Sequence, residues 1–135
     1  MAYVTWGPKI ELGIDIVDRQ HRGLIDLINN LGEAIDDGRT QEQMTVTISA
    51  LVDYTHTHFR TEETLLERAN YDAIDQHKHE HRIFTDQIEI YRDRFVAGSL
   101  SVSEPLMHYL SGWLVTHITV SDQAYLPSML EAGIR

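Results

Sequence analysis

The sequence contains no cysteine among its 135 residues and no apolar run long enough to span a bilayer. Without cysteine there is no disulfide framework, and there is no thiolate to act as a nucleophile or to bind zinc or an iron–sulfur cluster. The first residues, MAYVTWGPKIELGID, lack the basic and apolar parts of a secretory signal. These absences fit a reducing compartment, so we expect a cytoplasmic protein without membrane insertion.

Basic residues are also scarce. Eleven Lys and Arg stand against 21 Asp and Glu, which gives a formal net charge of −10. Such a charge repels phosphate backbones and anionic membranes, so nucleic acid is excluded as an expected partner. The length fits one domain over residues 1–135, large enough to bury a core without covalent cross-links.

Four segments carry apolar residues at steps of three and four, the pattern of a helix with one buried face. They cover residues 21–35, 44–66, 74–95 and 106–117. The sequence DDGR at 36–39 interrupts the first segment with charge and glycine.

Residues that begin or end helices flank the other segments. Thr40 and Gln43 have the spacing of a capping box, and Gly98 predicts the end of the third helix. Ser101 or Ser103 is expected to cap the fourth helix, which should weaken or kink at Pro127. Short connections between amphipathic helices favour antiparallel neighbours, so we predict an all-α, up-down-up-down four-helix bundle. The first 17 or so residues are expected to form an extended N-terminal arm.

Helical geometry divides the eight histidines into two sets. Five are predicted to point inward: His21, His58, His77, His81 and His117. Three are predicted to point away from the core: His56, His79 and His108.

Two acidic residues accompany the inward histidines. Glu62 follows His58 by four residues and shares its face, and a buried carboxylate needs a cation or a partner. No Lys or Arg is predicted to point inward and neutralise it. Asp122 lies five residues after His117, a rotation of about 140° on an ideal helix. A π-bulge or a local kink would bring both inward.

Five imidazoles and two carboxylates are too many ligands for one tetrahedral zinc, and two octahedral metals fit better. If both carboxylates and one oxide or hydroxide bridge the ions, the donors fill all but one of about 12 positions. Imidazole with carboxylate suits iron, and an open position on a redox-active pair suits dioxygen. Manganese, cobalt or zinc could occupy the same ligands in a preparation, and acid should release the metal.

The segments WGPKIELGIDIVDRQH, HFRTEE, HKHEHRIF and WLVTHITVSDQAY together resemble the hemerythrin family, in particular its single-domain bacterial members. The resemblance implies that His77, His81 and His117 hold one iron and that His21 and His58 hold the other. It further implies that Glu62 and Asp122 bridge the two irons and that the second iron binds dioxygen reversibly.

An imidazole-rich site provides less negative charge for high-valent iron than carboxylate-rich di-iron enzymes do, which favours reversible binding over oxidation. Trp113 and Leu114 precede His117 on its helix face, and two interpretations stay open for them. They are either an apolar dioxygen pocket or ordinary core packing.

The predicted function is an oxygen carrier, store or delivery protein, and not an enzyme. The expected partners are dioxygen and an oxygen-consuming protein, and the chain is expected to be a monomer.

An oxygen or redox sensor would use the same ligands, but no output domain is evident. A di-iron enzyme acting on peroxide or nitric oxide would need a relay, for which His79, Glu63 and Glu67 are candidates. We interpret these three as an exposed polar face. A metal-free bundle would leave Glu62 buried and unpaired.

Asp18, Gln20 and Glu80 could accept hydrogen bonds from the outer nitrogens of the histidine ligands. We expect solvation at the surface for all three. Tyr125 follows Asp122 by three residues, so it either reaches a bridging carboxylate or only packs in the core.

Overall fold

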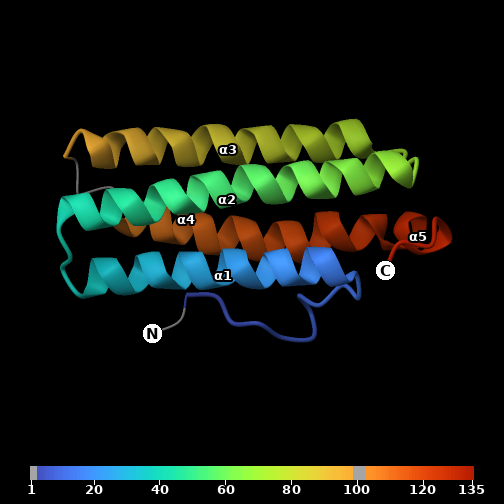
Figure 1. Cartoon of the computed structure of the whole chain (residues 1–135), viewed down its shortest axis with the longest axis horizontal. Helices are drawn as coiled ribbons and strands as arrows, with labels where there is room; N and C mark the ends of the chain where they lie inside the picture. The colour runs from blue at the N-terminus through green and yellow to red at the C-terminus, as the bar shows by residue number, and fades with distance from the viewer. Residues whose placement is uncertain (1–2, 99–102) are drawn as a thin grey trace.

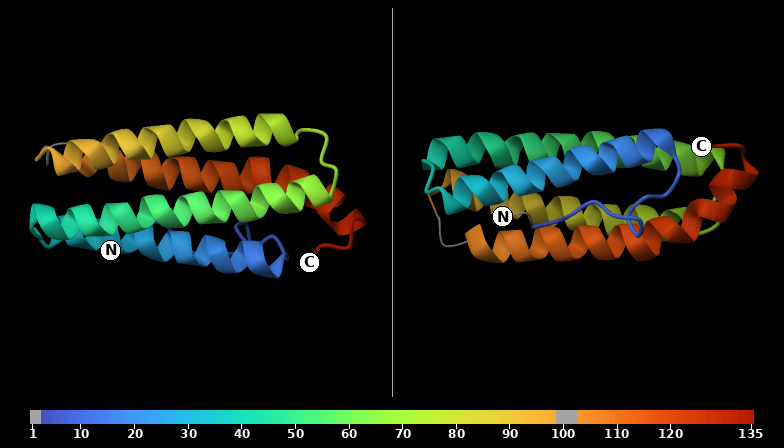
Figure 2. Two further views of the ribbon diagram at one scale, coloured as in Figure 1. Left: turned by 45° about the horizontal axis from the view of Figure 1, so that its top comes forward. Right: turned by 90° about the horizontal axis from the view of Figure 1, so that it is seen from below.

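The computed structural model describes residues 3–98 and 103–135, which form a helical bundle (Figure 1). Its elements are α1 (Asp15–Asp36), α2 (Gln41–Arg68), α3 (Ile74–Val96), α4 (Ser103–Thr116), the π-helix η2 (His117–Asp122) and α5 (Gln123–Glu131). The last three follow one another without a break and form the fourth helix. Each helix packs against the next in sequence, and α4 also packs against α1, so the bundle closes (Figure 2). The predicted up-down-up-down four-helix bundle is confirmed.

Within the described ranges, no helix combines the length and the apolar character needed to cross a membrane.

The predicted helix boundaries are confirmed at most places. Thr40 and Gln43 form a capping box, in which each backbone N–H donates to the other residue's side chain. Gly38 and Gly98, just beyond α1 and α3, have φ angles of 65° and 92°, a left-handed backbone that favours glycine and ends a helix. Ser103 is the first residue of α4, whereas Ser101 lies outside the described residues.

The N-terminal arm is shorter than predicted, because α1 begins at Asp15 and leaves residues 3–14 outside it. The Asp18 carboxylate explains the early start, since it accepts hydrogen bonds from the backbone N–H of Leu12 and of the residue that follows. Farther along the arm, the Asn29 side chain hydrogen-bonds the backbone of Val4. These contacts fix the arm along the bundle.

The fourth helix departs from α-helical winding between His117 and Asp122, and it does not end at Pro127. The change begins at His117, well before Pro127, and α5 continues past the proline to Glu131. Figure 2 shows α5 turning away from the line of α4. The irregular winding therefore falls on the predicted metal ligands.

The core is apolar at one end of the bundle. Its fully buried side chains there include Leu31, Ile48, Leu51, Ile88, Phe95, Leu106 and Leu110. Each such side chain contributes about 1.5–3 kcal/mol through its removal from water. This packing fixes the four helices relative to one another and lets the other end hold a polar cluster.

Candidate metal centre

The seven predicted metal ligands all lie at the opposite end of the bundle, and none is more than 5% exposed. α1 supplies His21, α2 supplies His58 and Glu62, α3 supplies His77 and His81, and η2 supplies His117 and Asp122. The other three histidines lie outside the cluster, as predicted: His56 is half-exposed, and His79 and His108 are exposed. The chain therefore brings together the complete predicted set.

The π-helix η2 explains how His117 and Asp122 share one face. In an α-helix, residues five apart diverge, but the wider turn of a π-helix brings such residues into line. His117 Nε2 consequently lies 3.2 Å from Asp122 Oδ1. Of the two alternatives left open by the sequence, a π-bulge or a local kink, the structure has the π-bulge.

The two oxygens of Glu62 face different histidines. Oε1 lies 2.6 Å from His77 Nε2 and 3.0 Å from His81 Nε2. Oε2 lies 3.5 Å from His58 Nε2 and 3.8 Å from His21 Nε2. One carboxylate therefore reaches histidines on three helices.

Asp122 divides its oxygens in the same way. Oδ1 lies 3.1 Å from His77 Nε2 and 3.2 Å from His117 Nε2, and Oδ2 lies 3.2 Å from His21 Nε2. Both carboxylates thus have one oxygen beside two members of the group His77, His81 and His117, and the other oxygen beside one or both members of the pair His21 and His58.

Donor atoms close enough to hold a cation occur in two overlapping groups. One is Glu62 with His77, His81 and His117, and the other is Glu62 with His21 and His58. Within each group the donor atoms lie within 4.8 Å of one another. Each group therefore has the compactness that a metal ion requires.

The polar atoms of this cluster are incompletely satisfied. Both carboxylate oxygens of Asp122 are buried without a hydrogen-bond partner, and no Lys or Arg of the described residues is buried. A buried carboxylate without a compensating charge costs several kcal/mol. The donor set and this unmet need for positive charge fit metal binding.

Both carboxyl groups are acidic. Burial and the nearby Asp122 raise the pKa of Glu62, but hydrogen bonds from His77 and His81 lower it to about 2. Burial likewise raises the pKa of Asp122, but the nearby ring nitrogens of His117, His21 and His77 outweigh burial and bring it well below its usual range. Both groups are therefore ionised at neutral pH, the form that binds a metal.

The imidazoles differ in their affinity for protons. Burial lowers the pKa of His58 to about 3, so this side chain is neutral and available as a ligand. Burial also lowers the pKa of His77, but the adjacent carboxylates of Asp122 and Glu62 outweigh burial and raise the pKa to about 10. In the metal-free protein, a proton on His77 therefore supplies part of the missing positive charge.

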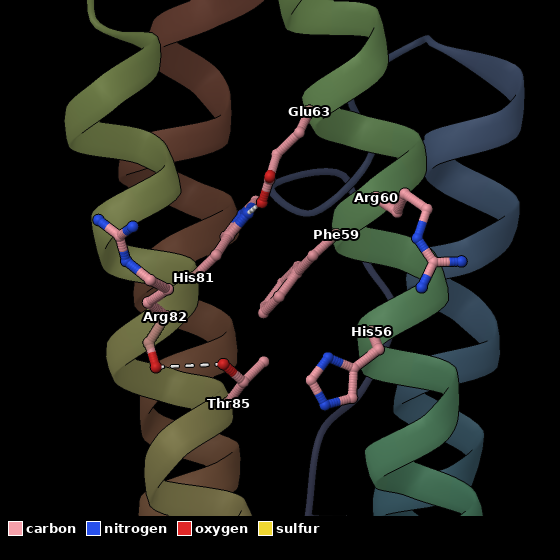
Figure 3. Close-up of a pocket in the computed structure, with 7 residues that line it drawn as sticks. All are labelled: His56, Phe59, Arg60, Glu63, His81, Arg82 and Thr85. Carbon is pink, nitrogen blue, oxygen red and sulfur yellow. Dashed lines mark hydrogen bonds and ion pairs between the residues drawn. The ribbon is translucent and has the colours of Figure 1, made fainter.

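Neighbouring side chains hold several of these groups in place. Gln20 Oε1 accepts a hydrogen bond from His58 Nδ1 at 2.8 Å. Glu63 Oε2 accepts one from His81 Nδ1 at 2.8 Å, and Figure 3 shows this second bond. The Tyr125 hydroxyl donates to Glu62 Oε2 at 3.2 Å. Our expectation that Gln20 and Glu63 are only solvated surface groups is therefore wrong, and Tyr125 does reach a carboxylate.

The other two residues considered for this role do not contact the histidine ligands. Asp18 binds the backbone of the arm, and Glu80 accepts a hydrogen bond from the Ser121 hydroxyl at 2.9 Å.

Apolar and aromatic side chains enclose the cluster. Leu114 is buried, and the Trp113 ring stacks on His117 with centroids 4.3 Å apart. Phe59 stacks on His81 with centroids 3.7 Å apart and an interplanar angle of 2°. The sequence analysis did not predict a role for Phe59. The only sequence feature that could have indicated one is its position directly after His58.

Known proteins resemble this chain over nearly its full length. A family profile described as "Hemerythrin HHE cation binding domain" matches residues 12–129. Bacteriohemerythrin of Stenotrophomonas maltophilia is 39% identical over 93% of this chain and 80% of its own length. Myohemerythrin-1 of Phascolopsis gouldii is 26% identical over 90% of both chains.

The fold agrees with these relatives. A wild-type hemerythrin crystal structure superposes with a TM-score of 0.87 at 28% identity, covering 93% of this chain and 97% of that one. The chain belongs to the hemerythrin family.

Proposed function

We propose that this protein binds dioxygen reversibly at a non-haem di-iron centre. The two carboxylates provide the main support. Glu62 and Asp122 each have one oxygen beside two members of the group His77, His81 and His117, and the other oxygen beside His21 or both His21 and His58. This arrangement suits carboxylates that bridge two ions. The proposed ligands are His77, His81 and His117 on one iron, His21 and His58 on the other, and Glu62 and Asp122 on both.

Iron is the metal that best suits the proposed function. Mixed imidazole and carboxylate ligands accommodate iron, and the matching family profile is described as cation binding. Bound as a pair with an oxide or hydroxide bridge, iron would supply the electrons and the open coordination position for dioxygen.

The protein's own contribution is to position neutral imidazoles and to exclude water. His58 is held neutral by burial and oriented by Gln20. Leu114, Trp113 and Phe59 form an apolar and aromatic wall, which keeps water and its protons away from the centre. These features support an oxygen carrier, store or delivery protein rather than an enzyme. We further propose that it is a cytoplasmic monomer that delivers dioxygen to an oxygen-consuming protein.

The test is to load the metal-free protein with ferrous iron under argon, count iron per chain, and alternate oxygen with argon. Two irons per chain and a visible absorption change that reverses over many cycles are expected. Irreversible bleaching, or continuous oxygen consumption, would contradict reversible carriage.

Paired alanine variants test the ligands. His77→Ala should lose iron and gas binding, whereas the exposed neighbour His79→Ala should retain both. Full iron content in His77→Ala would remove this residue from the ligand set.

A further inference from the structure

The Nδ1 atoms of the proposed histidine ligands, which point away from the centre of the cluster, differ in their hydrogen-bond acceptors. His81 Nδ1 donates to a carboxylate, that of Glu63, and His58 Nδ1 donates to a neutral amide, that of Gln20, each at 2.8 Å. The Nδ1 atoms of His21 and His117 are buried without a hydrogen-bond partner. A charged acceptor therefore supports the group of three histidines, and an uncharged one supports the pair.

Glu63 is placed so that its charge acts on His81. It follows Glu62 on α2, so its side chain turns out of the core and is 27% exposed. It lines a cavity of about 300 Å³ between α2 and α3, which Arg60 and Arg82 also line. Figure 3 shows both guanidinium groups turned away from the Glu63 carboxylate, whose ion pair within the described residues is with His81.

A carboxylate changes a ligand more than an amide does. By accepting the outer N–H, it fixes the orientation of the ring and makes the inner nitrogen a stronger donor. Hydrogen bonds to an ionised acceptor are about twice as strong as those to a neutral one. A stronger donor favours the more highly charged ferric state over the ferrous state.

We propose that Glu63 is a positioning residue that acts through His81, strengthening metal binding at the three-histidine position and stabilising its ferric state. Gln20 positions His58 without adding charge, so the two metal positions differ in reduction potential. This inference rests on the proposed di-iron function and adds the residue that makes the two positions unequal.

The substitution that tests it is Glu63→Gln, because glutamine keeps an oxygen acceptor and removes the charge. Loss of such a partner typically changes metal affinity by about 10-fold or more. In the iron-loaded protein, we expect the reduction potential to rise by about 59 mV, the equivalent of a 10-fold change for one electron. The reverse change, Gln20→Glu, should lower the potential of the other position.

Glu67→Gln is the matched control. Glu67 lies one turn further along α2, is 61% exposed and pairs with Lys78 at 2.9 Å, so its substitution removes the same charge without touching a ligand. If the potential of Glu63→Gln moves no further than that of Glu67→Gln, the proposal is overturned.

Zinc affinity gives a second measurement that needs no dioxygen chemistry. By chelator competition, Glu63→Gln should weaken one zinc position about 10-fold, and Glu67→Gln should leave the affinity unchanged. Equal zinc affinities in the two variants would also overturn the role of Glu63. A different outcome would contradict the proposed function alone: the two variants differ in zinc affinity, but the iron-loaded protein does not bind dioxygen.

Discussion

Glu62 and Asp122 lie on different helices, yet each has one carboxylate oxygen near His21 and the other near His77. Two ionised carboxylates buried this close together repel each other. Their arrangement is stable only with positive charge between them, which metal ions supply in the loaded protein and protons on histidine supply in its absence. The same pair therefore determines both metal binding and the pH dependence of folding.

Asp122→Asn should lower the iron content from two per chain to one or none. The proposed bridging role needs a negative charge and two oxygens, and the amide has no charge and only one oxygen. Iron per chain after anaerobic loading is the measurement, and Asp86→Asn on the exposed side of α3 is the control. Two irons per chain in Asp122→Asn would show that Asp122 is not a required bridge.

Leu114→Asn should accelerate autoxidation of the oxygenated protein. Leu114 is 3% exposed and precedes His117 by three residues, so a polar amide there would bring water to the centre. Leu114→Met is the control, because it keeps the wall apolar and costs less than about 1.5 kcal/mol. Equal autoxidation rates for Leu114→Asn and the unsubstituted protein would leave Leu114 with a packing role only.

Helical spacing was sufficient to predict which side chains gather in the buried cluster, because it determines which residues of one helix share a face. His58 and Glu62 are four residues apart, as are His77 and His81, so each pair had to point the same way. The buried carboxylate of Glu62 then required a cation. The five-residue step from His117 to Asp122 also indicated a π-bulge or a local kink, and the structure has the first of these.

Contacts between helices were not predictable in this way. The hydrogen bond from His58 to Gln20 joins α2 to α1, and the hydrogen bond from His81 to Glu63 joins α3 to α2. Both depend on how far each helix is rotated against its neighbour, which spacing within one helix does not determine. The length of the arm was misjudged for a related reason, because a carboxylate inside α1 binds the backbone before it.

Tyr125→Phe should lower the free energy of unfolding of the metal-free protein by about 1.5–3 kcal/mol, the usual value of a hydrogen bond to a charged group. Burial and the two carboxylates raise the pKa of Tyr125 well above its usual range, so its hydroxyl remains a donor to Glu62. Urea unfolding measures the effect.

The control for this substitution is Tyr71→Phe. The Tyr71 ring meets Tyr125 edge-on at 6.3 Å, and its hydroxyl makes no hydrogen bond to another described residue. If Tyr71→Phe lowered the free energy of unfolding as much as Tyr125→Phe does, the hydrogen bond from the Tyr125 hydroxyl to Glu62 would contribute little.

The metal-free protein should be most stable near pH 6.5. Above this value the folded state binds more protons than the unfolded state, because the pKa of His77 rises from 6.5 to about 10 on folding. The stabilisation that protonated His77 gives the folded state is complete below pH 6.5. It is lost as the pH approaches 10, and the free energy of unfolding falls by up to about 1.4 kcal/mol per pH unit.

Below pH 6.5 the stability changes with pH in the opposite direction. The pKa of His58 falls from 6.5 to about 3 on folding and that of Glu62 from 4.5 to about 2, so the unfolded state binds more protons and acid destabilises the fold. Urea unfolding of the metal-free protein at a series of pH values should give a maximum with two declining sides. His77→Gln should make the alkaline decline shallower and keep the part of the acid decline that comes from His58, whose low pKa is due to burial. A stability that kept rising from pH 6.5 to 10 would contradict the protonated His77 between the two carboxylates.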